Sequence, residues 1–200
     1  MAEIAAIILA AGQASRYRAG GGMEASKLIA VVDGVPMVRL VAQAALTSRA
    51  RPVIAVTGHA REVVAAALGG LDIGFAHNPL FADGMASSLR TGIAALPPGA
   101  TGAVILLADM PRVTAAVIDA LTAALAANPG ALAAVPVFEG RRGNPVVLSR
   151  ALFPAVKTLL GDEGARRLFA EGGVIEVAVA DSAVTLDIDT PDALAAISGR

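Results

Sequence analysis

Residues 8–32, ILAAGQASRYRAGGGMEASKLIAVV, decide the fold and raise the question of function. An apolar strand reaches a turn of small residues, and a loop with two arginines, three glycines and a lysine follows. Such a glycine-rich, cationic loop after a first strand is typical of phosphate binding. Two common phosphate motifs nevertheless fail. The glycine after Gly12 is Gly20, too distant for G-x-G-x-x-G, and no glycine directly precedes Lys27, as a P-loop requires.

The loop has a chemical logic of its own. Ala10, Ala11 and Gly12 have little or no side chain, so a nucleotide could lie against their backbone, whose N–H groups can hold an anion. Arg16 and Lys27 could then reach over a polyphosphate as fixed cations. A solvent-exposed loop with scattered charge remains the alternative.

Bulk composition narrows the class of protein. Of the 200 residues, 56% are hydrophobic and 16% charged, which favours a globular domain with a large core. The absence of cysteine excludes disulfides and thiolate metal sites and makes a reducing cytoplasm the expected location. A net charge of −1 without a basic run argues against nucleic acid binding. The longest uncharged stretch, 120–138, is interrupted by Asn128-Pro129-Gly130, so we expect no membrane span.

The chain alternates between strand-like and helix-like segments. Apolar runs that predict strands lie at 4–10, 52–57, 71–76, 103–108 and 132–137. Segments that predict helices lie at 36–46, 61–68, 87–96, 114–127 and 191–197. This order predicts one α/β domain over residues 1–200, a three-layer Rossmann-like arrangement with a mostly parallel central sheet. Ligands in such sheets collect at the carboxyl ends of the strands, where Ala10–Gly12 and Asp109 would meet.

Two aspartate segments suggest a metal site. Asp109 ends the apolar run in ILLADMPRVT (105–114), where a carboxylate is costly unless it is paired or bound to a cation. Asp187 and Asp189 in LDIDTPDAL (186–194) alternate as on a strand and would point the same way. Hard carboxylate oxygens suit Mg²⁺ together with phosphate. Caps or turns before the following helices are the alternative for both segments.

Three further segments are rich in polar residues and glycine. NPLFADGMASSLRTGI (78–93) can be an Asp-Gly turn followed by a serine-capped helix, but this does not account for Asn78 and both serines. PVFEGRRGNPVVLSR (136–150) can be a hairpin with exposed charge. GDEGARRLF (161–169) can cap a helix with acids in its first turn.

The order of these segments, from Leu9 to about Leu194, resembles the MobA-like nucleotidyltransferase family, which has a GT-A-like fold. Within that family, the molybdenum cofactor cytidylyltransferase (MocA-like) branch is the most similar. The motifs that carry this resemblance are LAAG-x-x-x-R with a later KL, GMxxSL, DMP, GRRGNP and DxDTP. The resemblance implies catalytic Arg16, Lys27 and Asp109, and metal ligands Asp109, Asp189 and Asp187. Its implied nucleotide-binding residues are Leu9, Ala10, Ala11, Gly12, Arg16, Lys27, Gly84, Ser87, Ser88 and Asp109. Its implied acceptor-binding residues are Arg141, Arg142, Gly143, Asn144 and Pro145.

The resemblance also implies a reaction. CTP and Mo-molybdopterin would give molybdopterin cytosine dinucleotide and pyrophosphate, with Mg²⁺ or Mn²⁺ as cofactor. CTP is favoured because Ala11 stands where the guanylyl branch has glycine, which narrows the pocket against a purine. We expect a monomer that passes its product to a molybdenum hydroxylase apoenzyme. GTP as substrate, another phosphorylated acceptor such as a sugar phosphate or terpenoid precursor, and a cofactor-binding maturation chaperone remain alternatives.

Overall fold

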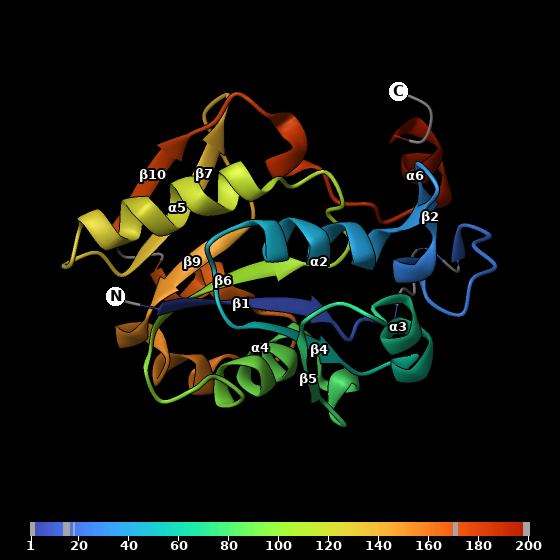
Figure 1. The fold of residues 1–200 in the computed structure, drawn as a ribbon, viewed down its shortest axis with the longest axis horizontal. Coiled ribbons are helices and arrows are strands. Elements are labelled where there is room, and N and C mark those ends of the chain that lie inside the picture. Colours follow the sequence, from blue (N-terminus) through green and yellow to red (C-terminus); the bar gives the residue numbers. More distant parts are fainter. Residues whose placement is uncertain (1–2, 14–16, 18, 170–171, 198–200) are drawn as a thin grey trace.

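The computed structural model describes residues 3–13, 17, 19–169 and 172–197, and its centre is a twisted sheet (Figure 1). The strand order is β10-β7-β9-β6-β1-β4-β5, with β8 paired to β7. The strands are β1 (Glu3–Ala10), β4 (Val53–Thr57), β5 (Gly74–His77), β6 (Ala100–Leu107), β7 (Ala133–Phe138), β8 (Arg141–Arg142), β9 (Val146–Ser149) and β10 (Val174–Ala178). Because β9 alone runs against its neighbours on the main path, the sheet is mostly parallel, as predicted.

Helices cover both faces of this sheet (Figure 1). On one face lie α2 (Met37–Thr47), α3 (Arg61–Ala67) and α5 (Ala115–Ala127). On the other lie α4 (Met85–Ala94) and the short 3-10 helices η3 (Arg150–Leu152), η4 (Ala155–Thr158) and η5 (Ala165–Phe169). The three-layer arrangement predicted from the alternating segments is therefore confirmed.

The central strand β1 shows why its sequence is apolar throughout. Ala6, Ile8 and Ala10 pack into the core under α2 and α5, whereas Ile7 packs into the core under α4. Successive side chains of a strand point to opposite faces, so a strand buried on both faces needs no polar residue. The same strand pairs in parallel with β4 and β6, which aligns their carboxyl ends at one edge.

A smaller unit lies beside that edge. It contains η1 (Lys27–Ile29), the hairpin of β2 (Val31–Val32) and β3 (Val35–Pro36), and α6 (Pro191–Ile197). The hydroxyl of Thr190 accepts a hydrogen bond from Ala193 N at 3.2 Å, so this residue caps α6 as its sequence predicts. Two more 3-10 helices, η2 (Phe81–Asp83) and η6 (Ser182–Thr185), lie in the loops before α4 and before the Asp187–Asp189 segment.

Three parts of the fold differ from the expectation. The antiparallel strand β9 and the edge strand β10 were not predicted, because β9 follows a charged hairpin and β10 is short and partly exposed. The strand expected through Asp187 and Asp189 is an irregular segment, because its backbone contact with the strand end is one hydrogen bond, from Ile188 N to Asp109 O at 3.0 Å. Within the described ranges, no helix is long and apolar enough to span a membrane.

Candidate active site

An open pocket of about 560 Å³ lies at the carboxyl edge of the sheet, where β1 and β6 end. Its lining combines small residues after β1, a lysine, four aspartates and the start of α4. The lining residues are Leu9, Ala11, Gly12, Gln13, Tyr17, Lys27, Leu28, Phe81, Ala82, Gly84, Met85, Ser88, Leu107, Asp109, Asp162, Asp187 and Asp189. Segments far apart in the chain thus converge where a parallel sheet is expected to bind its ligand.

Lys27 joins two of these aspartates. Its Nζ lies 2.7 Å from Oδ2 of Asp109 and 2.7 Å from Oδ1 of Asp189, and its side chain is only 12% exposed. Burial of the ammonium group lowers the pKa of Lys27, but the charges and hydrogen bonds of Asp109 and Asp189 outweigh that effect and leave it raised. The lysine is therefore a permanent cation at neutral pH, held by charge-assisted hydrogen bonds at the pocket wall.

The position of Lys27 has a local cause as well. Ser26 caps η1, because its hydroxyl accepts a hydrogen bond from Leu28 N at 3.3 Å. Ala30 N closes the turn by donating to the carbonyl of Lys27 at 3.0 Å. Leu28 is buried in the core under α2, which anchors the turn to the domain. The lysine thus extends from a short capped turn toward the ends of β1 and β6.

The turn after β1 is open to a ligand at Gly12. Ala10 is fully buried and does not line the pocket, whereas Leu9, Ala11 and Gly12 do. The carbonyl of Ala11 accepts a hydrogen bond from His59 N at 3.2 Å, which ties this turn to the end of β4. A side chain added at Gly12 would meet no atom of the described residues within 4 Å. Space therefore exists for a ligand to lie directly against this backbone.

A buried asparagine explains the two serines at the start of α4. Asn78 is 2% exposed, and its Nδ2 donates to the hydroxyl oxygens of Ser87 at 2.8 Å and Ser88 at 3.0 Å. Its Oδ1 accepts from Leu80 N at 3.0 Å. Ser87 also donates to backbone carbonyls of the preceding loop and does not line the pocket, whereas Ser88 does. Asn78 therefore fixes the serine that faces the pocket.

The segment 161–164 covers the start of α4 from the other side. Ala86 N donates to the carbonyl of Gly161 at 3.0 Å, and Met85 N donates to Oδ1 of Asp162 at 3.4 Å. Gly84 has a φ of +94°, and a side chain there would lie 2.4 Å from the backbone of Gly161. Only glycine fits this approach. The contact brings the Asp162 carboxylate to the pocket wall.

The predicted acceptor residues lie elsewhere. Arg141 and Arg142 form β8, are exposed, and pair with the end of β7, so the hairpin interpretation of this segment is confirmed. Arg142 Nε lies 2.7 Å from Oε1 of Glu176 on β10. Gly143 and Asn144 pack against the backbone of Val184. These residues and Pro145 do not line the Lys27 pocket.

The hairpin nevertheless lies near the second arginine-rich segment. Partial burial, and then the neighbouring Arg142 guanidinium, lowers the pKa of Arg166. Arg142 and Arg166 thus lie near each other, on β8 and η5, and neither lines the Lys27 pocket. The segments 136–150 and 161–169, both rich in arginine and glycine, therefore approach each other in the fold.

The carboxylates of the pocket could bind a metal ion that takes most of its ligands from the substrate. Asp109, Asp187 and Asp189 line one pocket, but no group of three or more His, Cys, Asp or Glu side chains in the described ranges is arranged to hold a metal by itself. Mg²⁺ commonly uses one or two carboxylates and completes its shell with phosphate oxygens and water. Hard oxygen donors beside a phosphate-sized space match that requirement.

The structure thus brings together nine of the residues predicted for the site: Leu9, Ala11, Gly12, Lys27, Gly84, Ser88, Asp109, Asp187 and Asp189. Arg16, predicted as a catalytic cation, lies outside the described residues. Tyr17 and Asp162 line the pocket but were not predicted as site residues. The sequence around Asp162, GDEG (161–164), can be interpreted as a helix cap and so does not identify Asp162 as a site residue. Tyr17 adjoins the predicted Arg16 but carries no motif of its own.

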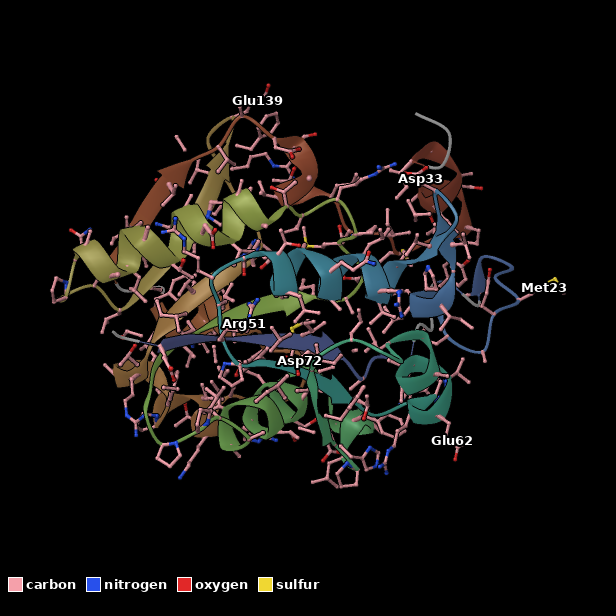
Figure 2. All side chains as sticks on the ribbon, viewed as in Figure 1. Met23, Asp33, Arg51, Glu62, Asp72 and Glu139 are labelled. Carbon is pink, nitrogen blue, oxygen red and sulfur yellow. The ribbon has the colours of Figure 1, made fainter. Side chains whose placement is uncertain are left out.

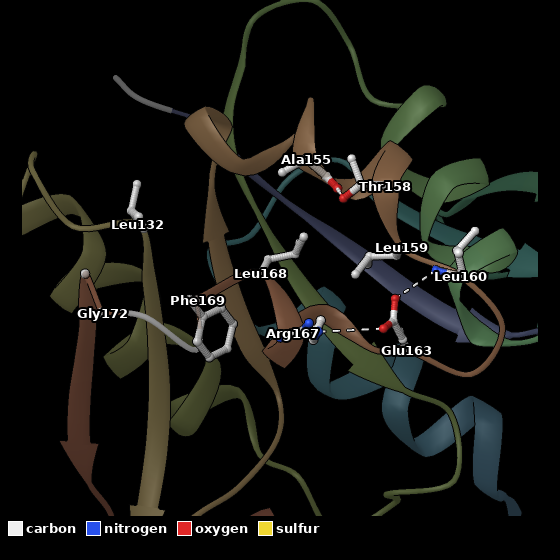
Figure 3. A pocket seen from close by; sticks show the side chains of 11 residues that line it. Leu132, Ala155, Thr158, Leu159, Leu160, Glu163, Arg167, Leu168, Phe169 and Gly172 are labelled. Atoms are coloured by element: carbon white, nitrogen blue, oxygen red, sulfur yellow. Dashed lines mark hydrogen bonds and ion pairs between the residues drawn. The ribbon is translucent and has the colours of Figure 1, made fainter.

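A second cavity, of about 710 Å³, lies near the amino ends of β7 and β10 (Figure 3). Leucine, alanine and glycine make up most of its wall. The charged side chains that the described residues contribute to it, Glu163 and Arg167, approach each other at 3.6 Å. Glu163 also accepts a hydrogen bond from Leu160 N at 2.9 Å. Because these charges compensate each other, this cavity is less suited to a polyphosphate than the Lys27 pocket.

Comparison with known proteins agrees with the geometry. The sequence pattern of the MobA-like NTP transferase domain matches residues 6–177. The purine catabolism protein PucB of Bacillus subtilis (strain 168) is 42% identical over 113 residues, which are 54% of this chain and 53% of PucB. The matched stretch therefore spans about half the length of that relative.

Solved structures extend the similarity to almost the whole chain. Rv0371c from Mycobacterium tuberculosis H37Rv is 26% identical, with a TM-score of 0.82, covering 98% of this chain and 97% of that one. A structure of Rv0371c in complex with manganese has a TM-score of 0.77 and 27% identity, with the same coverage of both chains. A nucleotidyl transferase from Methanothermobacter has a TM-score of 0.82 at 22% identity over 98% and 95% of the two chains, and supports the fold.

Proposed function

This chain belongs to the MobA-like NTP transferase family and is a nucleotidyltransferase, and we propose that it transfers CMP from CTP to a molybdopterin-type phosphate. The observation that carries the proposal is the position of Lys27. Lys27, mostly buried, holds the carboxylates of Asp109 and Asp189 at a pocket that also includes the open turn at Gly12. Fixed cations beside a polyphosphate are what nucleotidyl transfer requires, because charge builds up on the phosphate being transferred and on the leaving group.

The chemistry needs no covalent nucleophile on the protein. An oxygen of the acceptor phosphate, already ionised at neutral pH, attacks the α-phosphorus of CTP. The new bond joins that oxygen to the α-phosphorus, and the bond from the α-phosphorus to the bridging β-oxygen breaks. Its electron pair leaves with pyrophosphate. The protein must hold the two phosphates in line and stabilise the added charge.

The chain supplies these needs from three segments. The turn Ala11–Gly12 offers backbone against which the nucleotide can lie, and Lys27 stabilises charge on the α-phosphate and the leaving pyrophosphate. Asp109 and Asp189 position Lys27 and would hold Mg²⁺ or Mn²⁺. When bound, the metal supplies a further positive charge to the phosphates. The manganese complex of Rv0371c supports testing both metals.

The preference for CTP rests on Ala11. Ala11 is part of the pocket wall, and its Cβ lies close to Gly58, where an added side chain would come within 2.8 Å of it. A glycine at position 11 would remove this methyl group and widen the pocket beside the nucleotide. We therefore expect Ala11→Gly to raise use of GTP relative to CTP.

The test is pyrophosphate release from purified protein with Mo-molybdopterin and Mg²⁺, comparing CTP with GTP for wild type and Ala11→Gly. Release with CTP from the wild type, with a shift toward GTP in the variant, is the expected result. Release with GTP alone would overturn the choice of base and leave nucleotidyl transfer intact. CTP binding without release would overturn the acceptor and lead to a screen of other phosphorylated metabolites.

A further inference from the structure

Tyr17 lines the nucleotide pocket and has no role in the chemistry above. It is the one tyrosine of the chain, which also has no tryptophan. Only 2% of the residue is exposed, although it contributes to the wall of an open pocket. A tyrosine that is buried at the edge of a site usually has a partner for its hydroxyl, because a buried unpaired hydroxyl is costly.

The ring of Tyr17 lies beneath the glycine-rich loop. A side chain at Gly22 would lie 2.1 Å from ring atom Cε1 and 2.2 Å from Cδ1, so the loop backbone packs directly on the ring. Gly22 N donates a hydrogen bond to the carbonyl of Tyr17 at 3.1 Å. Any larger residue at position 22 would force the ring and the loop apart. This contact explains why the third position of the run Gly20–Gly22 is a glycine.

The other neighbours of the ring lead to the catalytic groups. Tyr17 belongs to a small apolar cluster with Ala30, Val32, Met37, Ile188 and Ile197. Ile188 is fully buried in this cluster, and its two sequence neighbours are Asp187 and Asp189. Ala30 closes the turn that begins with Lys27. The ring therefore connects the glycine-rich loop to both sides of the Lys27–Asp189 ion pair.

The side chain of Glu24 lies near the hydroxyl of Tyr17 and, after burial, is the main cause of its raised pKa. Glu24 precedes Lys27 by three residues and lies in the same loop as Gly22. The side chain between them, Met23, is 96% exposed, and Figure 2 shows it pointing away from the protein. One buried ring thus fixes the loop at two points, Gly22 and Glu24, while the residue between them faces solvent.

We propose that Tyr17 is a positioning residue that holds the glycine-rich loop against the pocket wall, through Gly22 and Glu24. The site is thereby preformed for the nucleoside triphosphate. The inference rests on the proposed function only in taking a nucleotide as the ligand. Its physical basis is preorganisation. A loop that is already held need not be ordered when the nucleotide binds, so the affinity for the nucleotide is higher.

The effect should appear in binding more than in the chemical step. Lys27 keeps both of its carboxylate partners when the Tyr17 hydroxyl is removed, so Tyr17→Phe should change kcat much less than the Kd for CTP. The Kd for CTP should rise about tenfold, which corresponds to about 1.4 kcal/mol, in the range of a hydrogen bond to a charged group. The retained ring should preserve the apolar cluster and hence the thermal unfolding midpoint.

The experiment is calorimetric titration of CTP with Mg²⁺, without acceptor, into wild type, Tyr17→Phe, Glu24→Ala and the double variant. We expect the double variant to bind no more weakly than either single variant, because all three lack the same interaction between these two side chains. Glu24→Gln should recover most of the affinity lost in Glu24→Ala, since an amide oxygen still accepts from the phenol. Met23→Ala, a change in the same loop at an exposed side chain, is the matched control and should bind as wild type does.

The outcomes separate this inference from the proposed function. Equal CTP affinity in wild type and Tyr17→Phe, or additive losses in the double variant, would overturn the role of Tyr17 and leave the nucleotidyltransferase assignment intact. Failure of the wild type to bind either CTP or GTP would overturn both. A single set of ring signals from ¹³C-labelled tyrosine, shifting on CTP addition, would give an independent sign that the nucleotide reaches this residue.

Discussion

The Nζ of Lys27 lies 2.7 Å from Oδ1 of Asp189, although 162 positions separate the two residues in the chain. This ion pair joins the loop after the first strand to the segment before the last helix. Asp109, at the end of β6, completes the arrangement from the middle of the chain. The pocket thus depends on three distant segments meeting at one edge of the sheet.

Replacing Lys27 tests its role in charge stabilisation. We expect Lys27→Ala to lower kcat about a hundredfold or more, because the loss of one preorganised cation costs about 3 kcal/mol in the transition state. Circular dichroism should show a folded protein. Lys157→Ala removes an exposed lysine on η4 and serves as the control. Near-normal turnover in Lys27→Ala would remove this residue from the mechanism.

The three aspartates should differ in importance. Asp109→Asn and Asp189→Asn each remove a carboxylate that holds Lys27. Each should lower kcat and weaken the binding of Mg²⁺, so that more Mg²⁺ is needed to reach half of the maximal rate. Asp187→Asn should have a smaller effect, because Lys27 binds the other two carboxylates. Steady-state rates over a range of Mg²⁺ concentrations measure this order. A larger loss for Asp187→Asn than for Asp189→Asn would reverse it.

Asn78 should matter for stability as well as for the site. Asn78→Ala removes hydrogen bonds to Ser87, Ser88 and Leu80 in a buried position. Leaving such groups unpaired costs about 1–3 kcal/mol of unfolding free energy. Urea denaturation measures the loss. Asn128→Ala, at an exposed position with one backbone hydrogen bond, is the comparison and should change stability much less.

Tyr17 also makes the protein sensitive to alkaline pH. Burial first, and then the hydrogen bond and charge of Glu24, raise the pKa of Tyr17 from 10.0 to about 12. Between these values the folded state binds the proton that the unfolded state has lost, so stability falls as the pH rises from about 10 to about 12. Because the chain has one tyrosine, absorbance at the tyrosinate wavelength follows this group alone. A midpoint near 10 in the folded protein would contradict the burial of this hydroxyl.

Much of the fold could be predicted from local signals. Continuous apolar runs indicated strands buried on both faces, and the helices predicted over 114–127 and 191–197 are present, capped by Thr114 and Thr190. Strand β9 was not predicted, because no feature of its own sequence indicates that it pairs antiparallel to both β6 and β7. Short edge strands such as β10 carry too little apolar pattern to identify.

The part of the site that lies at the ends of strands could be predicted from the sequence. Asp109 and Gly12 follow strands, so the rule for parallel sheets places them together. Tyr17 and Asp162 could not be recognised in this way, because their roles depend on contacts with Gly22 and with the start of α4. A turn and a helix cap do not account for Asn78 in the sequence, and only the folded structure shows that it holds two serines, nine and ten positions away.

Pyrophosphate release by the purified protein, with Mo-molybdopterin, Mg²⁺ and either CTP or GTP, tests the proposed cytidylyl transfer directly. Cytidylyl transfer at this site predicts release with CTP, little with GTP, and about a hundredfold less with CTP in Lys27→Ala. No release from wild-type protein that binds CTP would contradict the molybdopterin acceptor. Equal release from wild type and Lys27→Ala would contradict the site itself.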